Sequence, residues 1–465
     1  MAMPNNNRIP LHTLEAEPAP LYAARHKVQP RTAPGRYRRL RIGLGTLLLG
    51  VFFGLPWLQV QGRQAVWWDL PQRQFHIFNA TFWPQDFIFL AGLLIIAAFG
   101  LFFMTVYAGR LWCGYACPQS VWTWLFLWCE KITEGERHQR VRLDAAPWSA
   151  AKALRRAAKH GLWLALALAT GLAFVGYFSP LRALLPGFFS GQAEGWAYFW
   201  VGLTTLGTYL NAGWLREQVC VHMCPYARFQ SVMLDRDSLI VAYDAGRGEP
   251  RGPRRPGSAP PAQGLGDCID CTLCVQVCPT GIDIRQGLQV GCIGCAACVD
   301  ACDTVMSKVN YPKGLISYTS ERALAGEKNR TLRPRLLGYG AVLALMLGVL
   351  GTALATRAPA SLDVAKDRLL YRENAEGRLE NVYRLTIMNK TNLPHTYHLS
   401  ASGLPGLRLQ GHTHVNVPAR SQANVVVALS LAPEHWPGNA ATIDFELADG
   451  TMGVHATSRF SGPTP

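Results

Sequence analysis

Eight cysteines in two matching groups are the residues most able to do chemistry. One group reads C-I-D-C-T-L-C-V-Q-V-C-P and the other C-I-G-C-A-A-C-V-D-A-C-D, so both have the spacing C-x2-C-x2-C-x3-C. This spacing is typical of bacterial two-cluster ferredoxins, in which the fourth cysteine of each group ligates the other cluster. The sequence therefore predicts one [4Fe-4S] cluster on Cys268, Cys271, Cys274 and Cys302. It predicts the second cluster on Cys292, Cys295, Cys298 and Cys278.

The alternative for these cysteines is a pair of zinc sites. Structural zinc sites usually show two pairs of ligands rather than three cysteines followed by a fourth, so the spacing favours iron–sulfur clusters. The second group has Asp303 where the first has Pro279, a difference that removes no ligand.

The composition indicates a membrane protein. Of 465 residues, 49% are hydrophobic and only 16% are charged, which is low for a soluble chain. The formal net charge is +15, but the basic residues flank apolar stretches, which favours a topological role over nucleic-acid binding. All 13 cysteines precede residue 303, which argues against a disulfide framework. We expect the cysteine groups to lie in a reducing compartment, the cytoplasm.

Five uncharged stretches are long enough to cross a bilayer as helices. They are Ile42–Val60, Phe87–Gly109, Gly161–Leu181, Gly195–Leu215 and Leu336–Thr356. Basic residues are concentrated before the first stretch, between the second and third, and before the fifth. By the positive-inside rule, the N-terminus and the cysteine groups face the cytoplasm and the C-terminus faces the periplasm. The predicted location is the bacterial inner membrane.

These patterns predict a multi-domain membrane protein, an α-helical transmembrane bundle that carries a ferredoxin-like insert and an immunoglobulin-like β-sandwich. Alternating apolar residues such as Tyr383, Leu385 and Ile387, with turn signals between strands, predict the sandwich. No secretory signal is recognised at the polar N-terminus. The expected divisions are a flexible tail (1–35), four membrane helices (36–239), a cluster domain (240–335) entered through a Gly/Pro/Arg linker (246–264), a fifth helix (336–357) and an outer β-domain (362–465).

A second kind of cysteine motif, C-x3-C-P, occurs twice, after the second and the fourth apolar stretch. The pairs are Cys113 with Cys117 and Cys220 with Cys224. Because proline favours the first position of a helix, the second cysteine of each pair is expected at a helix N-cap, where the helix dipole favours the thiolate. Such pairs could hold a soft metal ion, with copper as the candidate, or cycle between dithiol and disulfide.

Several other residues allow both a functional and an ordinary interpretation. His222 and Met223 lie inside the second C-x3-C-P motif and are less certain copper ligands. The ordinary alternative is that cysteines in membrane helices are small buried apolar residues, and we treat Cys129 as structural. Arg110 and Arg216 precede the motifs and are interpreted as positive-inside anchors. A periplasmic copper role is weighed for His395, His398, His412 and His414, and the aromatic pairs Trp67-Trp68 and Phe82-Trp83 are interpreted as an interfacial belt.

The order of these parts resembles the FixG/CcoG/RdxA family of cytochrome oxidase accessory proteins. The match is carried by GRLWCGYACPQ from Gly109, by REQVCVHMCPYARFQ from Arg216, by Tyr243-Asp244 with RGEPRG from Arg247, and by the two cysteine groups. The resemblance implies a cupric reductase that converts Cu(II) to Cu(I) at Cys113, Cys117, Cys220 and Cys224 for assembly of cbb3-type cytochrome c oxidase. It implies two [4Fe-4S] clusters with transient copper, a cytosolic electron donor, copper-handling partners and a homodimer as one option.

Two other functions remain open at this point. The chain also resembles NapH/NosR quinol dehydrogenase subunits, which join C-x3-C-P motifs to ferredoxin cysteine groups and would feed a periplasmic reductase. A third option is a non-catalytic scaffold in which the clusters act as a redox sensor or a structural staple. The sequence does not indicate which cluster lies nearer the C-x3-C-P motifs.

Overall fold

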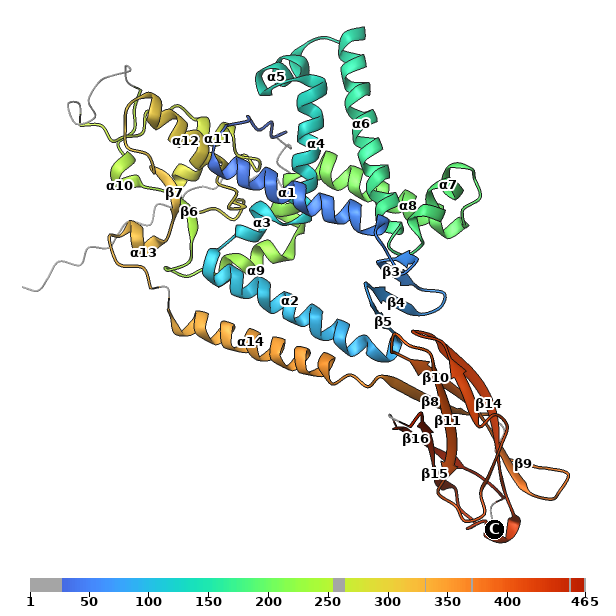
Figure 1. Ribbon diagram of the computed structural model, residues 1–465. Coiled ribbons are helices and arrows are strands. Elements are labelled where there is room, and N and C mark those ends of the chain that lie inside the picture. The colour runs from blue at the N-terminus through green and yellow to red at the C-terminus, as the bar shows by residue number, and fades with distance from the viewer. Residues whose placement is uncertain (1–26, 254–263, 331, 369–370, 451–452, 464–465) are drawn as a thin grey trace, which may run out of the picture.

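The computed structural model describes residues 27–253, 264–330, 332–368, 371–450 and 453–463. Residues 1–26 of the predicted tail and residues 254–263 of the predicted linker lie outside this part. The chain forms a helical region with the cysteine groups at one end and a β-domain at the other (Figure 1). Two long helices, α2 and α14, lie side by side between these ends.

In the helical region, short helices connect long apolar ones. Its helices are α1 (Arg36–Gly54), α2 (Phe87–Ala108), α3 (Leu111–Tyr115), α4 (Pro118–Glu134), α5 (Arg137–Ala145), α6 (Ala150–Val175), α7 (Leu181–Phe189), α8 (Gly195–Thr208), α9 (Pro225–Met233) and α14 (Pro334–Ala355).

Four of the described helical spans are long and apolar enough to cross a membrane. They are Arg36–Trp57, Pro84–Ala108, Ala150–Val175 and Pro334–Ala355. Apolar side chains on α2 and α14 are largely exposed on the protein surface, as expected of helices that face lipid. These helices mark the chain as a membrane protein.

The fourth predicted span differs from a simple helix. Gly195–Leu215 forms α8 for 14 residues and then continues as a π-helical turn, Tyr209–Leu215. A π-helical turn widens the helix and often occurs near functional sites. The predicted total of five crossings therefore stays a prediction.

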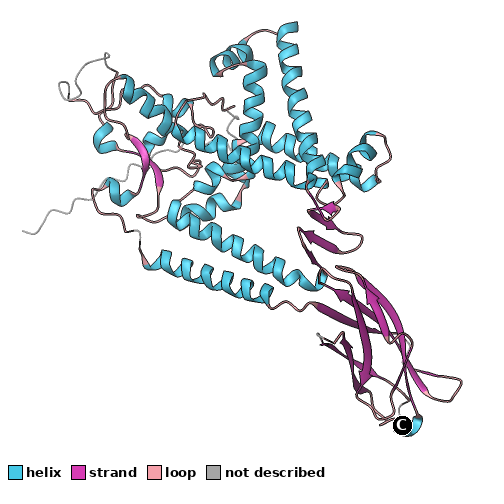
Figure 2. Cartoon of the chain, in the orientation of Figure 1, coloured by secondary structure: helices cyan, strands magenta, loops and turns pink. Residues whose placement is uncertain are grey.

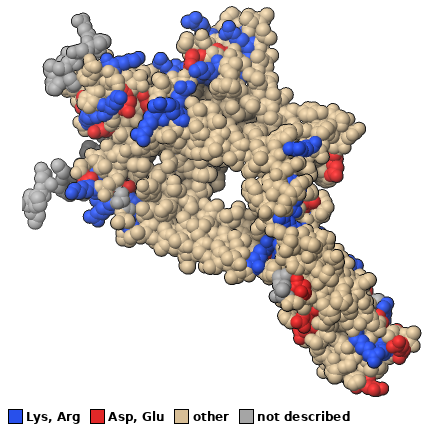
Figure 3. Space-filling view, viewed as in Figure 1, with Lys and Arg blue, Asp and Glu red and all other residues tan. Residues whose placement is uncertain are grey.

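Basic side chains are unevenly distributed over the surface. In the view of Figure 3, Lys and Arg gather over the cysteine-rich end and over α5 and the start of α6, while uncharged surface covers much of the region between that end and the β-domain. This separation is the pattern that lipid imposes on a spanning protein, because charged groups are excluded from hydrocarbon.

The loop between α1 and α2 folds into a small antiparallel sheet. Its strands are β3 (Val66–Asp69), β4 (Gln74–Ile77) and β5 (Ala80–Phe82), and a two-residue pair, β1 (Gln59–Val60) with β2 (Arg63–Gln64), precedes it. Trp67 donates its indole N–H to the carbonyl of Phe178 at 3.2 Å, and Trp83 is only 1% exposed. The prediction of an interfacial aromatic belt is therefore wrong for Trp83, which packs within the protein, and stays a prediction for the other three aromatic residues.

The C-terminal domain consists of two antiparallel sheets (Figure 2). The first has the order β12-β14-β10-β8 with β9 paired to β10, and the second has the order β13-β11-β15-β16. The predicted alternation is confirmed, because Tyr383, Leu385 and Ile387 are fully buried and share a core with residues of the other sheet. The strands are β8 (Ala360–Lys366), β9 (Arg372–Glu373), β10 (Leu379–Asn389), β11 (His395–Ser402), β12 (Arg408–Gln410), β13 (His414–Val417), β14 (Gln422–Leu431), β15 (Ala441–Ala448) and β16 (Gly453–Phe460).

The cysteine-rich region is a small module of short elements. They are β6 (Ile240–Tyr243), α10 (Ala245–Gly248), α11 (Leu273–Gln276), α12 (Ala297–Lys308), β7 (Ile316–Thr319) and α13 (Glu321–Leu324), with β6 and β7 paired antiparallel. This module docks on the start of α1. The carboxylate of Asp300 in α12 accepts hydrogen bonds from the backbone N–H groups of Tyr37 at 3.1 Å and Arg38 at 2.7 Å. Asp300 thus caps a helix from a distant part of the chain.

We predict that Asp300→Ala loosens this docking. The first N–H groups of α1 would lose their acceptor, and loss of a helix cap costs about 0.5–2 kcal/mol. Hydrogen exchange of the backbone amides of Tyr37 and Arg38 should become faster. The control is Asp303→Ala on the same helix, which removes a hydrogen bond to the N–H of Gly314 and should leave these amides unchanged. Equal exchange in both variants would contradict the capping role.

Candidate functional site

The eight cysteines of the two groups surround two small cavities. One cavity, called distal here, is lined by Cys268, Cys271, Cys274 and Cys302. The other, called proximal, is lined by Cys278, Cys292, Cys295 and Cys298, with Cys274 also at its wall. The fourth cysteine of each group therefore lies at the cavity of the other group.

The backbone around the cavities suits an iron–sulfur cluster. Residues on both sides of the second cysteine of each group have positive φ, namely Asp270 and Thr272 in the first group and Gly294 and Ala296 in the second. Alternation between left- and right-handed backbone conformations turns successive N–H groups inward and forms concavities that bind anions, Fe–S sites included. The donor set, four thiols per cavity, and this backbone shape both fit a [4Fe-4S] cluster.

The thiols also influence one another electrostatically. Burial and then the neighbouring Cys274, Cys271 and Cys268 raise the pKa of Cys302 to about 12. Burial and then Cys295, Cys292 and Cys278 raise the pKa of Cys298 well above its usual range. Cys302 is therefore close to the other thiols of the distal cavity, and Cys298 is close to the other thiols of the proximal cavity.

The four cysteines of the C-x3-C-P motifs gather beside the proximal cavity. Burial and then Cys117, Cys113 and Cys224 raise the pKa of Cys220 to about 12, so the two motifs are neighbours in space although about 100 residues separate them. Within the described residues, no group of three His, Cys, Asp or Glu side chains has the arrangement of a closed metal site.

The helix-capping expectation is confirmed in geometry for both cysteines, whereas the pKa of Cys117 shifts in the direction opposite to the one expected. Cys117 and Cys224 are the N-caps of α4 and α9, with Pro118 and Pro225 at the first helical positions. Burial nevertheless raises the pKa of Cys117, although the backbone N–H groups of Ser120 and Gln119 act in the opposite direction. Desolvation of the thiolate therefore outweighs the helix N-terminus.

The two C-x3-C-P motifs differ in local structure. Cys113 lies in the short helix α3, whereas Cys220 lies in a second π-helical turn, Val219–Met223. His222 and Met223 are exposed to the surroundings of the protein, and Met223 is 59% exposed. Their role as copper ligands stays a prediction.

A backbone-to-backbone contact joins the first C-x3-C-P motif to the proximal cavity. A Cβ added at Gly114, between Cys113 and Cys117, would lie 2.9 Å from Cys295 Cα and from the carbonyl oxygens of Ile293 and Gly294. Such an approach is possible only without a side chain. The loop that carries Cys295 therefore rests directly on the motif that carries Cys113.

Arg110 reinforces this contact from the other side. Its guanidinium donates to the carbonyl oxygens of Cys292 at 2.7 Å, Val290, and Ala227 at 3.2 Å. Burial lowers the pKa of Arg110, while Cys292 and Cys113 both act to raise it. This side chain is buried and bridges the membrane helices and the proximal loop, a contact beyond the predicted role as a positive-inside anchor, which stays a prediction.

Arg216, the other arginine interpreted as a positive-inside anchor, is also buried. It forms an ion pair with Glu130 of α4, and Arg140 of α5 binds the other oxygen of the same carboxylate at 2.7 Å. Its guanidinium lies 5.3 Å from the ring centroid of Trp163 in α6. These contacts hold the residue just before the second motif against three helices. Cys129, interpreted as structural, packs in the same region with Phe126 and is 1% exposed.

The histidines of the β-domain form pairs away from the cysteines. His398 and His414 are cross-strand partners whose ring centroids are 4.9 Å apart, and His395 contacts Asp449 at 2.5 Å. His412 is exposed. No described His, Cys, Asp or Glu group there forms a three-ligand site, so their copper role stays a prediction.

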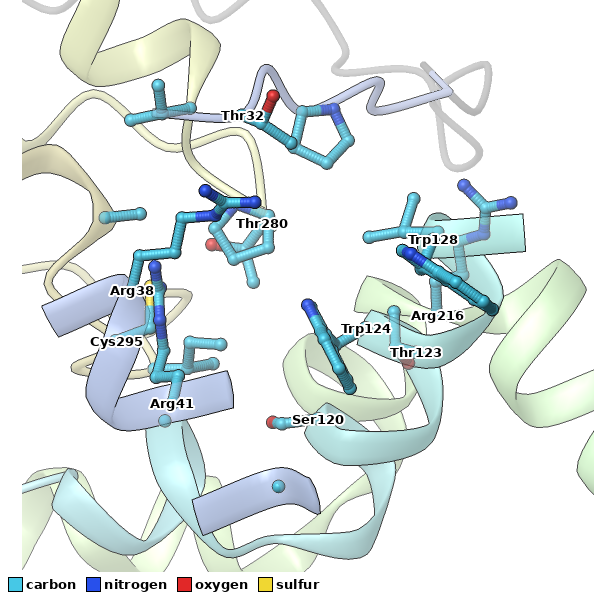
Figure 4. A pocket seen from close by; sticks show the side chains of 18 of the residues that line it. Thr32, Arg38, Arg41, Ser120, Thr123, Trp124, Trp128, Arg216, Thr280 and Cys295 are labelled. Carbon is cyan, nitrogen blue, oxygen red and sulfur yellow. The ribbon is translucent and has the colours of Figure 1, made fainter. Parts of the chain in front are cut away.

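Sequence reasoning missed a cavity of about 460 Å³ next to the proximal loop. It lies between α1, α4 and the residues around Cys295, and Cys220 also lines it. In Figure 4, Arg38 and Arg41 of α1 stand across the cavity from Trp124 and Trp128 of α4. The i, i+4 spacing of the two tryptophans was the only sequence signal for this wall.

Two protein-family models match the chain. Residues 215–321 match a 4Fe-4S dicluster domain, and residues 350–463 match the IG-like fold at the C-terminus of FixG. The matched ranges include the two cysteine-lined cavities and both β-sheets. The family models therefore support iron–sulfur clusters and the β-sandwich.

Curated relatives match over most of the chain. The nitrogen fixation protein FixG of Rhizobium meliloti is 40% identical over 84% of this chain and 82% of its own length. Protein RdxB of Cereibacter sphaeroides is 41% identical over 87% of this chain and 89% of its own length. Protein RdxA of the same organism is 39% identical over 92% of this chain and 94% of its own length. A crystal structure of a FixG-related protein from Vibrio parahaemolyticus, 28% identical, covers 22% of this chain and 95% of its own chain with a TM-score of 0.21.

We predict that Gly114→Ala disturbs the proximal loop. The added methyl group would meet backbone atoms at 2.9 Å, and overpacking of this kind typically costs about 1–3 kcal/mol. Loss of the visible iron–sulfur absorbance during denaturation should occur at a lower denaturant concentration. Gly100→Ala in α2, where a Cβ meets nothing within 4 Å, is the matched control and should be neutral or stabilising. A Gly114→Ala midpoint equal to that of the control would contradict the close contact.

Proposed function

Because the chain belongs to the FixG/RdxA family and carries a 4Fe-4S dicluster domain, we propose that it is a cupric reductase of the bacterial inner membrane. In this proposal electrons pass from a cytosolic donor through two [4Fe-4S] clusters to Cu(II) at the cysteines of the C-x3-C-P motifs. The Cu(I) product then supports assembly of cbb3-type cytochrome c oxidase, with copper-handling proteins as partners.

The observation that carries the proposal is the contact between Gly114 and the loop of Cys295. It supports a direct route for electrons from the proximal cavity to the thiols of Cys113 and Cys117. Arg110, which donates to the carbonyl of Cys292, strengthens the same junction. A redox centre in the proximal cavity and a metal ion at the motifs would therefore be separated by little more than one loop.

We assign the cluster ligands by the cavities that they line. Cys268, Cys271, Cys274 and Cys302 would hold the distal cluster, and Cys292, Cys295, Cys298 and Cys278 the proximal one. Cys271 is exposed, which supports the distal side as the approach for a soluble donor. Electrons would then pass from the donor to the distal cluster, from there to the proximal cluster, and finally to copper.

The four motif thiols suit copper as a substrate ion. Thiolates are soft ligands that favour Cu(I) over Cu(II), so binding there would assist a one-electron reduction. Because burial disfavours free thiolates at Cys113 and Cys220, a bound cation would supply the compensating charge. His222 and Met223 are exposed, so we do not include them among the proposed ligands of Cu(I).

The proposed orientation puts the cysteine-rich module and the N-terminus in the cytoplasm and the β-domain in the periplasm. Basic residues at the start of α1, in α5 and at the start of α6 accompany the cysteine-rich module on one side of the apolar region. Positive charge of this kind is retained on the cytoplasmic side. The reducing cytoplasm also suits thiol-ligated clusters.

The proposal is tested with protein reduced by dithionite under anaerobic conditions. Cu(II) is added after the dithionite is removed, and the return of visible cluster absorbance is followed with a Cu(I) chelator present. We expect fast reoxidation with one Cu(I) formed per electron, and loss of this reaction when Cys113, Cys117, Cys220 and Cys224 are all replaced by Ser. Cys129→Ala is the control and should react like the wild type, since Cys129 lies outside the motifs.

Iron analysis of the same samples checks that the variant still contains its clusters, about eight irons per chain for two filled sites. Equal reoxidation rates in the quadruple variant and in the control would contradict copper reduction at the motifs. Reoxidation by a quinone but not by Cu(II) would favour the quinol dehydrogenase alternative.

A further inference from the structure

The cavity between α1 and α4 has the size and lining of a small-molecule site. Its volume of about 460 Å³ falls within the range of about 300–1,000 Å³ that is usual for ligand pockets. Trp124 and Trp128 supply two aromatic rings, and Leu127 and Ile42 add apolar surface. Such walls suit a flat ring with an apolar tail.

Polar groups line this cavity on both sides. Arg38 and Arg41 of α1 face the tryptophans across the cavity, whereas Ser120 and Thr123 belong to α4 and Arg216 lies beside Trp128 (Figure 4). Guanidinium groups and hydroxyls donate hydrogen bonds to carbonyl or hydroxyl oxygens of a ligand. The cavity can therefore orient a ring that carries oxygen atoms.

The cavity lies at the boundary of the apolar region. All four α1 residues that line the cavity belong to the candidate membrane span Arg36–Trp57: Arg38 and Arg41 lie in its basic first turns, and Ile42 and Gly45 follow in its apolar part. A lipid-soluble molecule could therefore enter from the bilayer and keep its polar ring near the interface.

A redox centre adjoins the cavity. Cys295, a proposed ligand of the proximal cluster, lines it, and so does Cys220 of the second C-x3-C-P motif. A phospholipid would also suit the basic and apolar walls, but it does not exchange electrons with a redox centre beside the cavity. The combination favours a ligand that exchanges electrons.

We propose that this cavity binds an isoprenoid quinol, which supplies electrons to the proximal cluster as a second entry beside the cytosolic donor. This inference rests on the proposed electron path to copper. Oxidation of one quinol to quinone releases two electrons and two protons, and two one-electron centres can store the pair until two Cu(II) ions are reduced to Cu(I). The two protons are released to water.

Gly45 provides a way to fill the cavity without touching its polar groups. A Cβ at this position would make ordinary contacts, 3.8 Å to Val121 Cγ1 and 4.0 Å to Trp124 Cε3, so the rest of a leucine side chain has to occupy the cavity. Gly50 on the same helix is exposed, and a Cβ there meets nothing within 4 Å. Gly45→Leu and Gly50→Leu are therefore matched variants.

The test uses the full-length protein in detergent and a photoreactive azidoquinone. We expect saturable labelling of α1 and α4, displaced by an unreactive quinone, in the wild type and in Gly50→Leu. Gly45→Leu should bind at least about tenfold more weakly, equivalent to about 1.4 kcal/mol, while its iron content stays that of the wild type. Gly45→Ala, with its smaller side chain, should weaken binding less.

Two results would overturn the inference. Equal labelling of Gly45→Leu and Gly50→Leu would mean that the quinone dissolves in the micelle and does not occupy the cavity. Displacement of the label by phosphatidylglycerol as effectively as by quinone would identify a lipid headgroup site. Neither result affects the reoxidation of dithionite-reduced protein by Cu(II), which uses no quinol, so failure here is distinguishable from failure of copper reduction.

Discussion

The arrangement of the whole chain depends on the close backbone contact between Gly114 and the loop of Cys295. Without a side chain at Gly114, the first C-x3-C-P motif reaches backbone atoms of that loop that any Cβ would push away. Arg110 secures the junction because its buried guanidinium binds backbone carbonyls, Cys292 among them, on the opposite side. One small residue and one buried cation thus determine that a ferredoxin-like module lies against membrane helices and not free in solution.

Other long-range contacts keep this junction in register. Asp300 caps the first turn of α1 through two backbone N–H groups, so the module is attached to the first membrane helix as well as to the motif. Glu130 is buried between Arg140 and Arg216, and a buried carboxylate with two guanidinium partners is costly to separate. The second motif is therefore held by buried ion pairs, and the first by close backbone packing and by the hydrogen bonds of Arg110. Both motifs meet at the same place for different physical reasons.

The β-domain is connected to the membrane helices at the far end of the molecule. Asp86, at the start of α2, accepts hydrogen bonds from Arg357 after α14 at 2.5 Å and from Lys390 of the β-domain at 3.0 Å. A single buried carboxylate thereby joins two helices and a sheet. These contacts lie at the end of the molecule opposite the cysteine-rich module (Figure 1).

The sequence by itself determined the features that depend on local spacing. The ferredoxin cysteine pattern, the apolar stretches, the alternation in β10 and the prolines that begin α4 and α9 are each set by neighbours along the chain. Only the tertiary structure decided which cysteine group lies near the membrane motifs, because Arg110 and Cys292 are 182 residues apart and no local pattern encodes their meeting. The same reason explains why the buried contacts of Arg110 and the cavity near Trp124 were not predicted. Burial of a charge and the shape of a cavity arise from elements that pack together from distant parts of the chain.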